Sequence, residues 1–202
     1  MEKIIAASRN SHKIREMNAI TKAMGITVIS RDEAGVPPIE IVEDGQTFEE
    51  NSYKKASVIS RMTGCAAIAD DSGLMVDCLD GAPGVYSARF AGEDCDDSRN
   101  NEKLLRMMEG VPYSKRTARF VSVITVVFAD GSSVSSRGEC RGHILTELHG
   151  ENGFGYDPLF VPEGYDQTFA EISADEKNRI SHRAKALAGL RDLLENREAT
   201  HE

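Results

Sequence analysis

Hydrophobic and polar positions in the first part of the chain alternate between strand spacing and helix spacing. The apolar runs KIIAAS at residues 3–8 and ITVISRDE at 26–33 are short and suit buried strands. Between them, apolar side chains recur at helical spacing, at Ile14, Met17, Ile20 and Met24. Gly25 is placed to end the helix that this spacing predicts.

A second helix is predicted by signals at both of its ends. Thr47 and Glu50 form the pattern of a capping box, and Gly64 follows the last turn near Met62. The run AAIA at 66–69 then predicts a strand that ends at the two aspartates after it.

The second half of the chain predicts further strands, loops and helices. The segments are a structured loop at 77–92, a helix at 98–110, two long strands within 116–144 and a glycine-rich loop with a short strand at 150–165. Ser173 and Glu176 then cap a last helix, whose apolar stripe is formed by Leu187, Leu190 and Leu194. Hairpin-linked central strands and helix-linked outer strands predict an α/β protein with a mixed sheet, in a single domain over 1–202.

Composition and charge limit the classes of partner. With 40% apolar and 28% charged residues the chain is an ordinary globular mixture, and its formal net charge of -9 gives no general attraction to nucleic acid or anionic membranes. Any phosphate chemistry therefore requires a local basic site. No run is long enough for a signal peptide or a membrane span, and four widely spaced cysteines without a Cys-x-x-Cys pair suggest reduced thiols, so we expect a cytoplasmic protein.

The segment SRNSHK at residues 8–13 passes from a predicted strand into a predicted helix. Ser8, Asn10 and Ser11 would lie near the helix N-terminus, where free N–H groups favour an anion, and Lys13 adds a positive charge. An ordinary capped helix with one surface lysine is the simpler alternative. A Walker-type loop is absent from the sequence.

The pair Asp70 and Asp71 in the segment ADDSG has two interpretations. Carboxylates at the end of a strand suit Mg²⁺, which takes one or two of them and keeps several waters. The alternative is a solvated turn, because Asp-Ser-Gly is good turn chemistry. Side chains alternate along a strand, so the two aspartates should point in opposite directions. An acidic stretch before them could complete a metal site: Glu40, Glu43, Asp44, Glu49 and Glu50.

Two later segments also carry candidate binding residues. In GFGYDP, at 153–158, glycines permit close approach of a flat ligand on which Phe154 or Tyr156 could stack, although a tight turn with core aromatics explains the same pattern. In EKNRISHRAKAL, at 176–187, basic side chains are concentrated in an otherwise acidic protein. This cluster suits a bound polyanion, and a solvated helix face is the alternative.

In order along the chain, these segments resemble the inosine triphosphate pyrophosphatase family. The resemblance rests on SRNSHK, TFEENSYKKA, ADDSGLMVDCLDGAPGVYSARFAG, GFGYDPLF and EKNRISHRAKAL, and it extends from residue 3 to about 190. It implies an elongated mixed sheet flanked by helices, in two lobes with a central cleft, and a homodimer. It also implies Mg²⁺-dependent hydrolysis of dITP, ITP and XTP to the monophosphate and pyrophosphate, which removes deaminated purines from the nucleotide pool.

The same resemblance implies a role for individual residues. Asp71 would be the catalytic proton acceptor and would bind Mg²⁺ together with Glu43. The remaining assignments concern substrate: Ser8, Arg9, Asn10, Ser11, His12 and Lys13 for the triphosphate, Lys55 and Ser72 beside it, Phe154, Gly155, Tyr156 and Asp157 for the base pocket, and Lys177, His182 and Arg183 for the nucleotide and the purine edge. Arg183 can only donate hydrogen bonds, so it would favour the C6 oxygen of hypoxanthine or xanthine over the amino group of adenine.

Three alternative functions remain, one with a different substrate and two in a different functional class. A related pyrophosphatase could prefer another modified base, which a substrate panel would reveal. A nucleotide-sensing module should lack Asp71 or Lys13, and both are present. A nucleic-acid-binding protein fits poorly with the net charge of -9.

Overall fold

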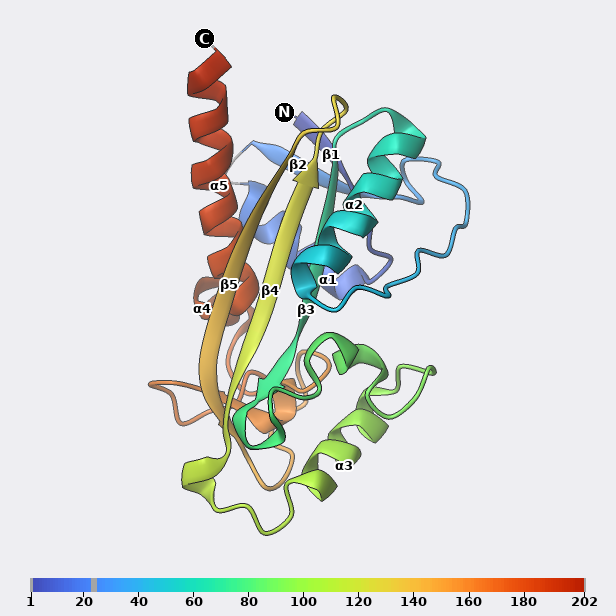
Figure 1. The fold of residues 1–202 in the computed structure, drawn as a ribbon. Coiled ribbons are helices and arrows are strands. Elements are labelled where there is room, and N and C mark those ends of the chain that lie inside the picture. The colour runs from blue at the N-terminus through green and yellow to red at the C-terminus, as the bar shows by residue number, and fades with distance from the viewer. Residues whose placement is uncertain (1, 23–24, 202) are drawn as a thin grey trace. The chain divides into compact units, whose positions relative to one another are not determined.

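The computed structural model describes residues 2–22 and 25–201, and its elements follow the order expected of an α/β chain (Figure 1). The strands are β1 (Glu2–Ala6), β2 (Ile26–Ser30), β3 (Ala67–Val76), β4 (Thr117–Val127), β5 (Ser133–Ile144) and β6 (Phe160–Pro162). The α-helices are α1 (Ser11–Thr21), α2 (Phe48–Thr63), α3 (Asp97–Met107), α4 (Ala174–Ile180) and α5 (His182–His201). The side chain of Ile20 and the whole of Met24, both expected on the first helix, lie outside the described residues.

The strands form one sheet in the order β2-β1-β3-β4-β5-β6. Strand β1 pairs in parallel with β2 and with β3, whereas β5 and β6 are antiparallel. Three consecutive residues of β1, Ile4, Ile5 and Ala6, are buried, as expected for a parallel strand covered on both faces. The predicted mixed sheet flanked by helices is confirmed.

The chain divides into two compact units. The first unit contains Met1–Asp71, Ser122–Gly138 and His182–Glu202, and the second contains Ser72–Val121 and Glu139–Ser181. Strands β3, β4 and β5 each contribute residues to both units. The single domain and the central cleft expected from the sequence stay predictions.

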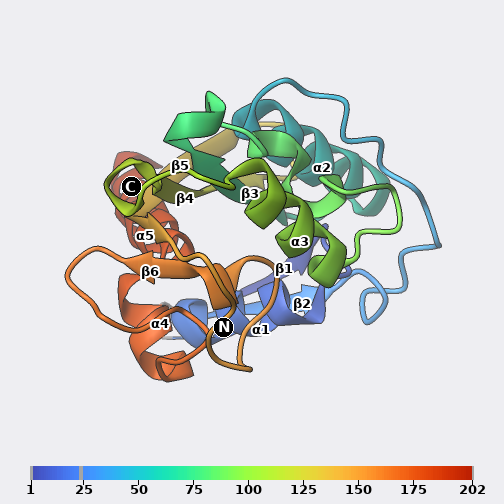
Figure 2. The same ribbon diagram turned by 90° about the horizontal axis from the view of Figure 1, so that it is seen from below.

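In the first unit, helices cover both faces of the sheet. Helix α2 lies on one side of β3 and β4, and helices α1 and α5 lie on the other (Figure 2). The α1 and α5 side is packed with apolar residues that include Ile4, Ile68 and Leu187, whereas Ala69 packs with Ile59 on the α2 side. Neighbouring residues of β3 therefore face different helices.

The second unit has a core of aromatic and aliphatic side chains. The rings of Phe120 and Phe160 lie edge to face with centroids 4.7 Å apart, and Phe169 packs against both. Leu104 and Met108 at the end of α3 are fully buried in the same cluster.

The predicted end of the third strand at the aspartates is wrong. Strand β3 continues through Asp70 and Asp71 to Val76, and the two carboxylate residues are only 1% and 6% exposed. The strand continues as a buried element beyond the aspartates, where Leu74 and Val76 are both completely buried. The solvated-turn interpretation is therefore excluded for this pair.

The last helix is also not continuous as expected. Ser173 caps α4 through the backbone N–H of Glu176, but α4 ends at Ile180 and Ser181 has extended dihedral angles before α5 begins. Serine is favoured at helix starts, so the sequence did contain a signal for this break. Leu187 and Leu190 are buried on α5 as predicted, and Leu194 is partly buried beside them.

The predictions made for the two ends of α2 are confirmed. Thr47 and Glu50 form a complete capping box at α2, and Gly64 ends that helix in the left-handed region at φ 65°. No disulfide joins the four cysteines. None of the helices in the described ranges is long and apolar enough to cross a membrane.

Candidate active site

Asp70 and Asp71 point to opposite faces of β3, as strand alternation requires. Asp70 contacts residues of α1, β4 and α5, and Asp71 contacts residues of α2. All of these residues belong to the first unit. Each aspartate therefore forms its own cluster.

The Asp70 cluster is a buried network of two carboxylates and two cations. The Asp70 carboxylate accepts from Lys13 Nζ at 2.8 Å, from Arg183 Nη2 at 3.2 Å and from the hydroxyl of Ser122. Arg183, only 1% exposed, also donates to Glu16. Burial alone would raise the pKa of Asp70, but Arg183 and Lys13 outweigh it and hold the pKa well below its usual value.

The Asp71 cluster is centred on one ammonium group. Lys55 Nζ donates to Asp71 Oδ1 at 2.7 Å and to Glu43 Oε2 at 2.8 Å. Asn51, one turn before Lys55 on α2, donates to Asp71 Oδ2 at 3.4 Å and accepts from the backbone N–H of Gly45. Gly45 has no room for a side chain, because a Cβ there would lie 2.6 Å from Asn51 Oδ1. The loop that carries Glu43 is thereby fastened to α2.

One lysine cannot fully compensate two carboxylates, and the pKa values reflect this. Burial raises the pKa of Asp71 to about 6 although Lys55 is adjacent. Glu43 is more exposed than Asp71, and the attraction of Lys55 overcomes its burial and lowers its pKa. Asp71 is therefore the group in this cluster that exchanges a proton nearest to neutral pH.

The oxygens of Asp71 and Glu43 fit a divalent cation. Both carboxylates contact the same positive group, and Mg²⁺ takes one or two carboxylates while keeping several waters. Among residues 2–22 and 25–201 no set of three or more His, Cys, Asp or Glu side chains is arranged to hold a metal ion. Two carboxylate oxygens thus suit a magnesium ion that keeps several of its waters.

The start of α1 is capped by its own residues. Asn10 Oδ1 accepts from the backbone N–H groups of His12 at 3.0 Å and Lys13 at 3.2 Å, and Ser8 Oγ accepts from Asn10 N. The cap of the simpler alternative is therefore present, but its surface lysine is not, because Lys13 pairs with the buried Asp70. Two of the amide groups that could have bound an anion are already used, so positive side chains matter more here.

In the second unit, the predicted base-pocket residues form a compact cluster. Lys177 Nζ pairs with Asp157 Oδ2 at 2.7 Å and lies 4.8 Å from the centre of the Phe154 ring. Asp157 Oδ2 also accepts from the backbone N–H of Phe154 at 2.9 Å. Tyr156 instead joins the core and donates to the carbonyl of Ser87, as the core-aromatic alternative proposed.

The amino-terminal half of α3 holds this loop from the side. Asp97 Oδ2 accepts from Gly155 N at 2.7 Å, and Asn101 Nδ2 donates to Gly155 O at 2.9 Å. Asn100, next to Asn101, binds the backbone of Ala88 and Ala91 in the preceding loop. Helix α3 therefore fixes both loops, a role that the sequence analysis did not anticipate.

Several residues of these clusters were missed at the sequence level. Glu16 and Ser122 lie outside the quoted motifs, and Asn51 lies within TFEENSYKKA but was given no role. Asn51 and Lys55 are four residues apart on α2 and so share a helix face. That spacing could have identified Asn51. Ser122 and Glu16 approach Asp70 only through the fold.

The structure brings together some of the predicted site residues within each unit. Lys13 and Arg183 meet at Asp70, and Lys55 and Glu43 meet at Asp71. The other predicted members are placed as follows: Arg9, Ser11 and His12 are exposed near the start of α1, Ser72 is half-buried in β3, and His182 is buried at the start of α5. The roles assigned to all these residues toward substrate stay predictions.

Comparison with known proteins adds sequence and structural relatives. The sequence pattern of the Ham1 family matches residues 4–193. A dITP/XTP pyrophosphatase of Desulforamulus reducens is 50% identical, with 99% of this chain and 98% of the relative covered. One of Clostridium perfringens is 48% identical, covering 96% of this chain and 98% of the relative.

Solved structures give the same relationship. The Ham1 protein of Staphylococcus aureus matches with a TM-score of 0.86 and 39% identity, over 97% of this chain and 100% of that one. A HAM1 protein of Coxiella burnetii matches with a TM-score of 0.85 and 40% identity, over 97% and 100% of the two chains.

Proposed function

The chain belongs to the Ham1 family, and from this membership we propose that it is a nucleoside triphosphate pyrophosphatase acting on dITP, ITP and XTP. The reaction would cleave the bond between the α- and β-phosphates and release the monophosphate and pyrophosphate. The observation that carries the proposal is the buried Asp71, which shares Lys55 with Glu43 in the first unit. Relatives named dITP/XTP pyrophosphatase, at 48–50% identity, support the choice of substrate.

Attack of water on a phosphorus atom needs a proton acceptor, and Asp71 suits that role. With a pKa of about 6, Asp71 is mostly ionised at neutral pH yet basic enough to accept a proton from water. Asn51 and Lys55 hold its two oxygens, which limits the rotation of the carboxylate. A strongly acidic carboxylate such as Asp70 would be a poorer base.

Charge on the substrate would be balanced by lysines that are already positioned. Lys13 is held by Asp70, and Lys55 is held by Asp71 and Glu43. Positioned cations stabilise developing negative charge without reorganisation during the reaction. Mg²⁺ bound by Asp71 and Glu43 would supply further charge neutralisation and lower the pKa of a bound water.

The base-recognition roles expected of the second-unit cluster and of Arg183 remain part of the proposal. Phe154 would stack on the base, with Lys177 Nζ 4.8 Å from the centre of its ring, while Lys177 and Asp157 pair a donor with an acceptor. Arg183 has Asp70 and Glu16 as partners, so its proposed contact with a purine would involve a guanidinium whose orientation these carboxylates fix. The homodimer and the cytoplasmic location also stay predictions.

A pyrophosphate-release assay tests the proposed function. The panel would contain dITP, ITP, XTP, GTP and ATP, each with and without Mg²⁺, and kcat/KM would be compared. We expect efficient release from dITP, ITP and XTP only in the presence of Mg²⁺. Equal values for all five nucleotides, or none at all, would contradict the proposal.

A further inference from the structure

Arg31, which directly follows β2, is a buried cation to which no role has been given so far. It is 7% exposed, and its Nε has no hydrogen-bond partner. Within the described ranges, no hydrogen bond or ion pair joins its side chain to another residue, and Asp32 offers only electrostatic attraction. A buried charge without a paired group is costly, so such a group needs an explanation.

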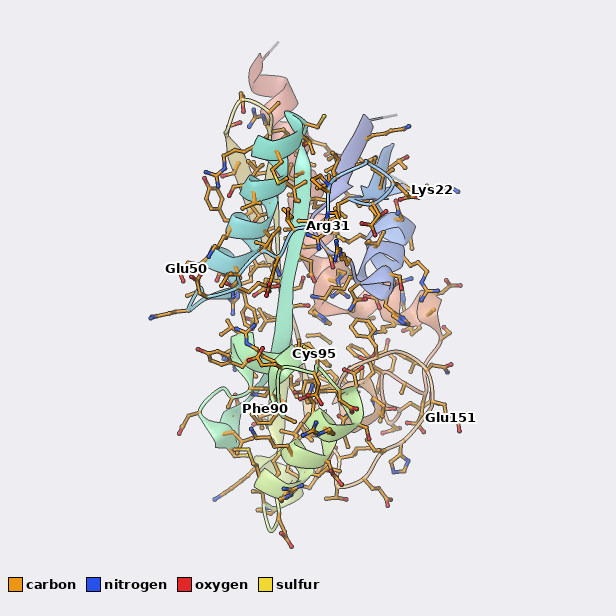
Figure 3. All side chains as sticks on the ribbon, turned by 90° about the vertical axis from the view of Figure 1, so that its right-hand side faces the viewer. Lys22, Arg31, Glu50, Phe90, Cys95 and Glu151 are labelled. Carbon is orange, nitrogen blue, oxygen red and sulfur yellow. The ribbon has the colours of Figure 1, made fainter. Side chains whose placement is uncertain are left out.

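Arg31 is also close to a second guanidinium. Strands β1 and β2 are parallel with Ala6 opposite Ser30, so Arg31 and the Ser8–Lys13 segment follow the same carboxyl edge of the sheet. Burial and the repulsion of Arg9 both lower the pKa of Arg31. Figure 3 shows Arg31 between helices α2 and α1 of the first unit. Ligands of open α/β sheets commonly bind at this carboxyl edge.

The other cations nearby are already committed to carboxylates. Lys13 and Arg183 pair with Asp70, and Lys55 pairs with Asp71. Asn10 also occupies amide groups at the start of α1. Within the described part of the chain, the cations here that are not paired with a carboxylate are therefore Arg9, after β1, and Arg31, after β2.

We propose that Arg9 and Arg31 form an anion subsite that takes a pyrophosphoryl group, with Arg31 as its buried anchor. A guanidinium presents several N–H donors in a planar fork that matches phosphate oxygens. A phosphate anion would pair the buried charge and relieve the repulsion between the two arginines. The identity of the anion as the pyrophosphate portion of a nucleoside triphosphate, or as free pyrophosphate, rests on the proposed function.

The subsite makes opposite predictions for affinity and for stability. Replacing Arg31 with methionine removes a buried charge that no protein group pairs, so the ligand-free variant should unfold at the same temperature as the wild type or a higher one. If Arg31 served only to stabilise the fold, the ligand-free variant should unfold at a lower temperature than the wild type. Affinity for pyrophosphate should fall about tenfold or more, because a charge-assisted hydrogen bond to the anion is lost.

The experiment measures inorganic pyrophosphate binding by calorimetry without added metal, together with the melting temperature of each ligand-free protein. The wild type is compared with Arg31→Met, Arg9→Met and Arg31→Lys. Arg191→Met is the matched control, because Arg191 is an exposed arginine on α5 in the same unit. We expect Arg31→Met to weaken binding about tenfold or more, Arg31→Lys to restore part of it and Arg191→Met to leave it within about twofold.

The outcomes separate this proposal from the proposed function. A change of less than about fivefold for Arg31→Met overturns the subsite, as does an equal loss for Arg191→Met. If Arg31→Met does not fold, Arg31→Gln, which also removes the charge, decides by the same fivefold threshold. Pyrophosphate binding requires no turnover, so a wild type that binds it through Arg31 but hydrolyses no triphosphate would refute the proposed function alone. KM for dITP, measured in parallel, shows whether the substrate uses the same subsite: a rise matching the loss of pyrophosphate affinity supports it, and an unchanged KM limits the subsite to free pyrophosphate.

Discussion

At the scale of single residues, two adjacent aspartates acquire different chemistry because their surroundings differ. Asp70 is balanced by Lys13 and Arg183 and stays ionised, whereas Asp71 shares one lysine with Glu43 and holds its proton more tightly. The covalent groups are identical, so the difference comes from their surroundings: Asp70 has two cations and the hydroxyl of Ser122, whereas Asp71 is buried beside Lys55 and the carboxylate of Glu43. Only Asp71 is suited to accept a proton near neutral pH.

Asp71→Asn should lower kcat by at least about a thousandfold while leaving the protein folded, because the amide cannot accept the proton. Burial makes the ionised carboxylate costly, so the unfolding temperature of the variant at pH 8 should not fall. Steady-state kinetics and thermal melts check both parts. Near-normal pyrophosphate release by Asp71→Asn would remove Asp71 from the mechanism.

The metal-free protein should also show the raised pKa of Asp71 directly. The folded state holds this proton up to about pH 6, whereas the unfolded chain loses it near pH 4. The stability that Asp71 contributes is therefore fully present below about pH 4 and is lost as the pH rises through 6. Carboxyl chemical shifts followed by NMR, with Asp71→Asn for assignment, should give a midpoint near 6. A midpoint close to 4 would mean that Lys55 compensates the carboxylate fully.

Asp70→Asn should act mainly on stability, in contrast with its neighbour. It removes an ionised partner of the buried Arg183, which keeps its ion pair with Glu16, and it removes the ion pair of Lys13, at a cost of about 3 kcal/mol. The folded state depresses the pKa of Asp70, so the stability that its ionised carboxylate contributes is fully present above about pH 4, the value in the unfolded chain. This stability is lost as the pH falls below about 4 toward the pKa of the folded state. Chemical denaturation at pH 7 and pH 3 measures the effect. An equal loss at both values would show that ionisation of Asp70 is not the cause.

At the scale of elements, close contact between α5 and β5 fixes the start of the helix that carries His182 and Arg183. A Cβ on Gly138 of β5 would lie 2.2 Å from the carbonyl oxygen of His182 and 2.3 Å from Ala186 N. The backbone of Gly138 is not in the left-handed region, so the requirement for glycine is steric. Strand and helix thus position Arg183 against Asp70 through backbone contact.

Gly138→Ala should therefore destabilise the protein by about 3 kcal/mol, because backbone atoms on α5 cannot move aside like a flexible side chain. Ser133→Ala, at an exposed position of the same strand, is the control and should change stability by less than about 0.5 kcal/mol. Denaturant midpoints give both values. If Gly138→Ala is as stable as the control, α5 does not rest on β5 as closely as described.

At the scale of the whole molecule, an acidic protein carries paired cations at the site proposed for a polyanion. The net charge of -9 repels nucleic acid and phosphates in general, so affinity for a triphosphate has to come from local groups. Within the first unit, Lys55 already balances part of the charge of Asp71 and Glu43. The fold should therefore not depend on a bound metal.

Removing divalent metal should abolish turnover of dITP but leave the protein folded. Chelation by EDTA would remove the charge that Mg²⁺ supplies to the phosphates, and Lys55 would keep the carboxylates paired. Activity and near-UV circular dichroism are compared before chelation, after it and after Mg²⁺ is restored. Unfolding on chelation, or full activity without metal, would contradict this account.

The sequence by itself determined the elements and the candidate chemistry. Periodicity and caps predicted the α/β arrangement, including the capping box at Thr47 and Glu50, because these signals act within a few residues of the chain. The ordered segments around Lys13, Lys55, Asp71 and Lys177 supported the family resemblance. Strand alternation also predicted that the two aspartates face opposite sides.

Tertiary structure decided how these groups are paired and ionised. Only the fold brings Arg183 to Asp70, 113 positions away in the chain, and brings Glu43 and Lys55 to Asp71. It also continues β3 through the aspartates and leaves the side chain of Arg31 buried without a hydrogen bond or ion pair among the described residues. The physical reason is that burial and the pairing of charges depend on distances between segments, which local sequence patterns do not encode.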